Sequence, residues 1–147
     1  MMTKTDRMVL GDLVVEVVYR DEAVSRLLAF LLCDMQPQRN RSYVCVTRLA
    51  ISREQRAWRL SEEGGSLSVA KENLPELALL LLNTGMARLA EQNHRSIVLH
   101  SGLVSNEEGS LLLPGGPGVG KSNACLWLSH LGMRYHSDEM VLVDRDT

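Results

Sequence analysis

The segment 111–123, LLLPGGPGVGKSN, carries residue types that could bind a phosphate group. It fits the pattern GxxxxGK[ST], in which Gly115 and Gly120 are the two fixed glycines and Lys121 and Ser122 follow them. Glycines have no Cβ, so the loop can take positive φ angles and turn its N–H groups toward an anion. The Lys121 ammonium can reach the β and γ phosphates of a nucleotide, and the Ser122 hydroxyl can bind Mg²⁺. The sequence therefore predicts a Walker A loop, with a lining of Gly115, Gly116, Pro117, Gly118, Val119, Gly120, Lys121, Ser122 and Asn123.

Two adjacent carboxylates and one histidine could act on the bound phosphate. Asp138 and Glu139 follow a short strand that should return the chain to the sheet edge carrying the loop. There they could act as a general base or help to bind metal, whereas elsewhere such a pair is most often a solvated turn. His100 lies on a strand before the loop, where it either orients phosphate or acid or has a structural role. We expect His100, Lys121, Asp138 and Glu139 to be the catalytic residues.

Further candidates have weaker patterns. Asp144 closes an apolar run and resembles a Walker B aspartate, which would hold Mg²⁺ through water or Ser122; a strand-ending acid is the equal alternative. Cys125 lies one turn into the helix after the loop, where the helix N-terminus could lower its pKa, but packing against a sheet is the favoured role. Surface or helix-end positions are expected for His94, His130 and His136. Core or partner-facing positions are expected for Trp58 and Trp127.

The elements that must position these residues follow from hydrophobic periodicity. After a short polar lead, strands are expected at 13–19, 42–48, 55–60, 66–70, 97–104 and 110–113, with a further strand pair at 133–136 and 140–143. Helices are expected from Asp21–Glu22 to a stop at Met35–Gln36–Pro37, and at 76–92 and 121–131, with a left-handed Gly132 after the last. The strands between 42 and 70 should form a small meander. The polar patch 91–96 is the best boundary, giving regions 1–94 and 95–147.

Composition narrows the class of protein. The 147 residues are 45% hydrophobic and 23% charged, with a formal net charge of −2, so no overall positive field favours nucleic acid. Apolar runs are far shorter than the roughly 20 residues that cross a bilayer, and the start lacks a secretory signal. Three scattered cysteines suit reduced thiols. We therefore expect a cytoplasmic globular protein that binds neither nucleic acid nor membrane.

The segment 97–144 resembles the catalytic core of HPr kinase/phosphorylase and its relatives, whose P-loop is set in a fold similar to phosphoenolpyruvate carboxykinase. The shared pattern is a histidine on a strand, a GxSGxGKS loop, a helix ending in glycine and a pair of acids. The resemblance implies the fold class α/β, with a small α+β N-terminal region before an incomplete P-loop core. Its residue matches are the active-site histidine at His100, the nucleotide loop at 115–122 with the magnesium-binding Ser122, the helix-ending Gly132, the first acid at Asp138 and the catalytic acid at Glu139.

The chain also departs from this pattern. Glu139 stands where the family has an aspartate, and Pro117 replaces the usual loop serine. The family's later magnesium-binding glutamate, its HPr-binding loop and its catalytic arginine would lie beyond Thr147, so the core is expected to be truncated. The N-terminal region is more similar to that of the shorter HPr-kinase-like proteins, including lasso-peptide kinases and the ScmC group.

These features predict an ATP- and Mg²⁺-dependent kinase that phosphorylates a serine hydroxyl on a small protein or peptide. One alternative is a nucleotide- or phosphate-binding module without catalysis, because about fifty residues are few for a complete nucleotide domain. Sheet edges left unpaired in such a core would favour association of copies, so a homo-oligomer is expected. The other alternative is an ATPase or GTPase of another P-loop lineage, with Asp144 as its Walker B acid.

Overall fold

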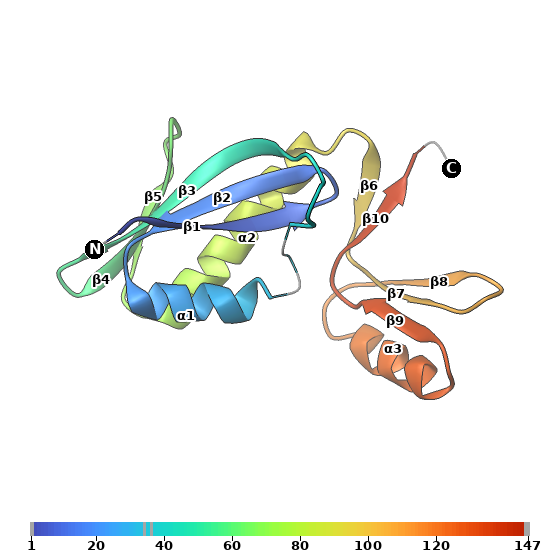
Figure 1. The fold of residues 1–147 in the computed structure, drawn as a ribbon. Helices are drawn as coiled ribbons and strands as arrows, with labels where there is room; N and C mark the ends of the chain where they lie inside the picture. The colour runs from blue at the N-terminus through green and yellow to red at the C-terminus, as the bar shows by residue number, and fades with distance from the viewer. Residues whose placement is uncertain (1, 34, 36, 146–147) are drawn as a thin grey trace. The chain divides into compact units, whose positions relative to one another are not determined.

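The protein is a mixed α/β chain that forms two compact units (Figure 1). A computed structural model describes residues 2–33, 35 and 37–145, in which there are three helices and ten strands. Unit 1 is Met1–Gln92 and unit 2 is Asn93–Thr147; the boundary expected from the polar patch lies two residues later. None of the helices in the described residues is long and apolar enough to cross a bilayer.

Unit 1 is built on a five-stranded sheet with the strand order β1-β2-β3-β4-β5. Its strands are β1 (Lys4–Leu10), β2 (Leu13–Tyr19), β3 (Val44–Glu54), β4 (Ala57–Glu62) and β5 (Ser68–Lys71). β2 and β3 are parallel, and β3, β4 and β5 form the predicted antiparallel meander. The prediction of a polar segment without a strand before Leu13 is wrong. β1 lies there and pairs along its whole length with the β-branched strand β2, across a turn at Gly11 with φ 64°.

Two helices share the core of unit 1 with the sheet. α1 (Glu22–Leu31) begins after Asp21, whose side chain accepts a hydrogen bond from the Ala23 N–H at 2.8 Å. α1 ends at Leu31, before the helix end predicted at residues 35–37. Residue 36 lies outside the described residues. α2 (Leu74–Gln92) extends the predicted helix by two residues. Fully buried side chains from both helices and the sheet make up this core, including Met8, Val15, Val17, Val24, Leu28, Leu49, Leu60, Leu77, Leu81 and Leu89.

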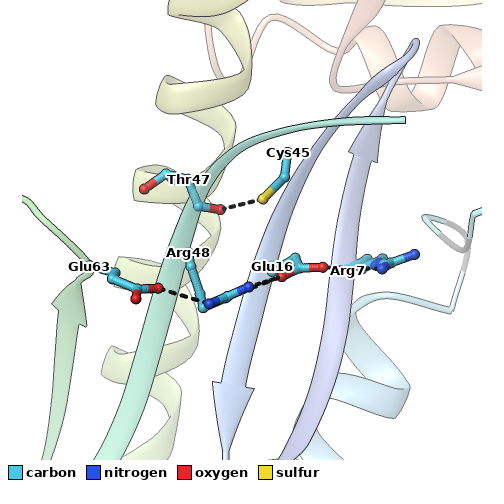
Figure 2. Close-up of polar contacts among 6 residues, drawn as sticks. All are labelled: Arg7, Glu16, Cys45, Thr47, Arg48 and Glu63. Carbon is cyan, nitrogen blue, oxygen red and sulfur yellow. Dashed lines mark hydrogen bonds and ion pairs between the residues drawn. The ribbon is translucent and has the colours of Figure 1, made fainter. Parts of the chain in front are cut away.

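Alternating charges cross the other face of this sheet (Figure 2). Glu16 lies between two core residues of β2, so its side chain points away from the helices. It accepts hydrogen bonds from Arg7 on β1 and Arg48 on β3, and Arg48 also reaches Glu63 at 3.0 Å. These bonds, from Arg48 most strongly, lower the pKa of Glu16. This face is therefore a solvated polar surface.

Unit 2 joins a three-stranded sheet, a two-stranded sheet and one helix. Its elements are β6 (Ser96–Leu99), β7 (Ser101–Ser105), β8 (Ser110–Pro114), α3 (Lys121–His130), β9 (Arg134–Ser137) and β10 (Val141–Asp144). The sheet orders are β8-β7-β9 and β10-β6. Because β8 and β9 are both antiparallel to β7, they are parallel to each other, and α3 connects them. The chain thus returns after α3 to the sheet from which the glycine loop leaves.

Two sequence predictions for unit 2 are wrong. The strand expected at 97–104 is interrupted at His100, because β6 pairs with β10 whereas β7 pairs with β8 and β9. The strands near 133–136 and 140–143 exist, but they pair with β7 and β6 and not with each other. The helix end is confirmed, since Gly132 has φ 95° just after α3.

Candidate functional site

The glycine loop connects β8 to α3 in the predicted order of strand, turn and helix. Gly118 and Gly120 have φ angles of 79° and 92°, which residues with a Cβ rarely adopt. A Cβ added at Gly116, Gly118 or Gly120 would meet nothing within 4 Å. The loop is therefore open toward solvent, and its glycines serve backbone conformation and not close packing at these positions.

The start of α3 offers backbone donors to an anion. Its first intrahelical bond runs from the Ala124 N–H to the Gly120 C=O at 2.9 Å, and no side chain in the described residues caps this end. The N–H groups of the three residues from Lys121 to Asn123 therefore precede the helical ladder. They border an open pocket of about 260 Å³, lined by Gly118, Gly120, Lys121, Ser122 and Asn123. Small-molecule pockets usually have about 300–1,000 Å³, so this pocket fits a phosphate tail better than a whole nucleotide.

The Lys121 side chain bends back over the loop. Its Nζ donates to the Gly115 and Gly116 carbonyl oxygens at 2.8 and 3.0 Å, and lies 2.9 Å from His100 Nε2. An ammonium group can only donate, so Nε2 is the acceptor in this contact. The Nδ1 atom faces Glu139 Oε1 at 3.7 Å. The structure thus joins Lys121, His100 and Glu139 in one chain of polar contacts at the loop.

Asp138 forms the second half of the cluster. Its carboxylate accepts a hydrogen bond from the Tyr135 hydroxyl at 2.8 Å. The nearby Ser122 hydroxyl is the largest cause of the lowered pKa of Asp138, followed by the hydrogen bond from Tyr135, and the charge of Lys121 adds to it. Asp138 is therefore a stably ionised carboxylate beside the serine that follows the loop lysine.

This pair of oxygen groups fits Mg²⁺, which prefers hard oxygen ligands. In the part of the chain that the structure describes, no three His, Cys, Asp or Glu side chains gather as a metal site. Mg²⁺ often binds through one or two carboxylates plus substrate phosphates and water, and does not need a protein cage. Ser122 and Asp138 would hold the ion in that manner.

A serine-based turn places both acids. The Ser137 Oγ accepts from the Glu139 and Met140 N–H groups, each at 3.3 Å, and donates to the Met140 C=O at 2.9 Å. The Ser101 N–H of β7 also donates to the Glu139 C=O at 3.3 Å. Sequence reasoning missed both Ser137 and Tyr135. A serine two residues before Glu139 is a known turn pattern and could have been found, whereas the tyrosine has no comparable signal.

Not all predicted residues join the cluster. Asp144 lies opposite Ser96 at the end of β10, about 10 Å along the strand from Val141. Among the described residues it is thus at the far end of β10 from the acid pair, so the expected magnesium role beside Ser122 is not supported. His136 instead contacts the Ser105 hydroxyl at 2.6 Å. The predicted packing role of Cys125 is confirmed, because its thiol is fully buried and burial raises its pKa, opposite to the helix effect considered.

The remaining aromatic and histidine candidates lie apart from the loop's polar contacts in the described residues. Trp58 is buried in the core of unit 1, whereas Trp127 is exposed on α3. His130 is in the last turn of α3, and His94 precedes β6. Comparison with protein-family models, curated proteins and solved structures found no match to this chain. The function is therefore argued from the chemistry of the cluster.

Proposed function

We propose that this chain binds Mg²⁺-ATP through residues 115–123 and transfers the γ-phosphoryl group to a serine hydroxyl on a small protein or peptide, as its resemblance to HPr kinase/phosphorylase implies. The observation that carries the proposal is the chain of polar contacts at the loop, in which Lys121 Nζ lies 2.9 Å from His100 Nε2 and His100 Nδ1 lies 3.7 Å from Glu139 Oε1. Lys121 begins α3, His100 lies between β6 and β7, and Glu139 follows β9, so the fold brings together groups that are far apart in the sequence.

Each group in the cluster supports a distinct role. The loop amides and Lys121 would bind the phosphates, and Ser122 and Asp138 would hold Mg²⁺. The ion, when bound, would neutralise negative charge on the phosphate oxygens. The Asp138 carboxylate is already bonded to the Tyr135 hydroxyl at 2.8 Å, whereas the Glu139 side chain is 78% exposed. Glu139 is thus the better general base for the acceptor serine, with His100 positioned between it and Lys121.

Calorimetry with ATP, with and without Mg²⁺, tests binding, and transfer of a labelled γ-phosphate to a library of synthetic serine peptides tests catalysis. Lys121→Ala should weaken ATP binding at least tenfold. Glu139→Gln should keep ATP binding within about threefold but lower transfer by about 10²-fold or more, as expected for a general base. Glu108→Gln, on the exposed turn between β7 and β8, is the matched carboxylate control. Equal ATP binding by the wild type and Lys121→Ala would overturn the proposal.

The pocket volume favours one second candidate, a phosphate-binding module without catalysis. The pocket of about 260 Å³ is lined only by loop and α3 residues, so base and ribose have no enclosed subsite within it. Inorganic tripolyphosphate distinguishes the two functions. A module that recognises only phosphate should bind tripolyphosphate as tightly as ATP and show no peptide phosphorylation with either the wild type or Glu139→Gln.

A further inference from the structure

We infer that Tyr135 is a positioning residue of the magnesium site: its hydroxyl fixes the Asp138 carboxylate in the orientation that Ser122 and Mg²⁺ share. This inference rests on the proposed function. Tyr135 has no place in the sequence-based account of the site. It would act only through Asp138, because the described structure gives its hydroxyl no bond to the loop itself.

The backbone of β9 is shaped for this contact. Val104 of β7 pairs with Tyr135, but the preceding residue, Leu103, pairs with Ser137, so His136 is an extra residue in β9. Such a bulge bends a strand and redirects its side chains. In a regular strand, residues three apart lie about 10 Å from each other and point to opposite faces. The bulge and the Ser137 turn instead bring the Tyr135 hydroxyl within 2.8 Å of Asp138 Oδ1.

The bond restricts how Asp138 can turn. A carboxylate has about four lone-pair positions, and the Tyr135 hydroxyl occupies one on Oδ1. With the phenol in place, this donor from β9 fixes the orientation of the carboxylate. Without it, that restraint is lost and the carboxylate can rotate. Partners of metal-binding carboxylates typically contribute 10- to 100-fold to metal affinity, so loss of this hydroxyl should weaken Mg²⁺ binding about tenfold.

Phosphate binding should not depend on this hydroxyl. The groups that would bind the anion are the loop amides and the Lys121 ammonium. Lys121 Nζ contacts the Gly115 and Gly116 carbonyl oxygens and His100. Removal of the Tyr135 hydroxyl leaves these groups in place. The inference therefore predicts a specific loss of the Mg²⁺-dependent part of ATP affinity, which a general loss of structure would not produce.

The test compares ATP binding in excess Mg²⁺ and in EDTA by calorimetry on the full chain. Tyr135→Phe should lower affinity about tenfold in Mg²⁺ and by less than twofold in EDTA. Tyr19→Phe is the matched control, because the Tyr19 hydroxyl also donates to an aspartate, Asp6, at 2.5 Å in unit 1. It should leave both affinities unchanged.

The outcomes separate the two proposals. If wild-type ATP binding is independent of Mg²⁺, the proposed function fails. If wild-type binding depends on Mg²⁺ and Tyr135→Phe retains that dependence within twofold, the positioning role of Tyr135 is wrong. If Tyr135→Phe does not fold at the assay temperature, as judged by circular dichroism, the comparison is repeated at a lower temperature at which it folds, and the same two limits then decide the role of Tyr135.

Discussion

Gly102 on β7 allows α3 to pack closely against the sheet that carries the glycine loop. A Cβ added to Gly102 would lie 2.5 Å from the Cys125 Sγ and 3.4 Å from the Leu113 Cβ. Cys125 is fully buried, with its Sγ 3.8 Å from the Ser137 carbonyl oxygen. Gly102→Ala should therefore disturb the contact between β7 and α3, on which the loop and the acid-bearing turn both depend.

The size of the effect follows from this overlap. Non-bonded carbon atoms are most stable at about 3.5–4.0 Å, so Gly102→Ala must move the thiol or the helix by about 1 Å. Overpacking of this kind costs about 1–3 kcal/mol. Cys125→Ala removes one buried atom and should cost about 0.5–1.5 kcal/mol. In the double variant the new methyl group enters the vacated space, so the two changes should be coupled by about 2 kcal/mol of compensation.

Native-state hydrogen exchange, read by NMR, measures this in unit 2 separately from unit 1. The Ala124 N–H, which bonds to Gly120 at 2.9 Å, reports on the first turn of α3. A loss of about 2 kcal/mol in Gly102→Ala should accelerate its exchange about 30-fold. The double variant with Cys125→Ala should restore most of the protection.

A glycine without neighbours serves as the control. Gly109 lies in the turn between β7 and β8, and an added Cβ would meet nothing within 4 Å. Gly109→Ala should change the opening free energy by less than about 0.5 kcal/mol. The packing argument is refuted if Gly102→Ala exchanges like the wild type, or if its effect and that of Cys125→Ala simply add within about 0.5 kcal/mol.

Two further predictions concern the other unit and the loop. The pKa of Glu62 is lowered, mainly by hydrogen bonds from Arg88, so its stabilisation is complete above the ordinary glutamate pKa of 4.5 and is lost as pH falls through the lowered value. Glu62→Gln should destabilise unit 1 by about 1 kcal/mol at pH 7 and flatten the decline of urea stability below pH 4.5, as followed by Trp58 fluorescence. In the loop, Gly120→Ala should be strained by the φ of 92° at this position and should lower the free energy of unfolding by about 1 kcal/mol. Gly116→Ala should be tolerated. Thermal melts and tripolyphosphate binding compare the two variants, and equal behaviour would contradict the loop geometry.

Local chemistry made several features predictable. The helix start at Asp21–Glu22, the glycine turn before Lys121 and the left-handed Gly132 are determined by residues within one turn of each other. Such features need only the conformational freedom of glycine or a single side-chain bond to the backbone. For that reason the helix starts and the loop were expected at positions close to those that the structure gives.

Strand partners were beyond the sequence pattern. The apolar run 97–104 reads as one strand, yet His100 separates two strands that pair in different sheets. An apolar pattern reports which residues avoid water but not which strand covers them. Likewise, the polar composition of β1 concealed a strand, because its stability comes from pairing with β2.

The amino-acid sequence by itself determined a glycine loop followed by lysine, serine and a helix, and it singled out Asp138 and Glu139 as acids of interest. Only the tertiary structure decided that Asp138 accepts a hydrogen bond from Tyr135, that Glu139 faces His100, and that Asp144 lies at the far end of its strand. The physical reason is that the first set of features depends on bonds along the chain, whereas the second depends on strand register, where one extra residue in β9 redirects the side chains that follow.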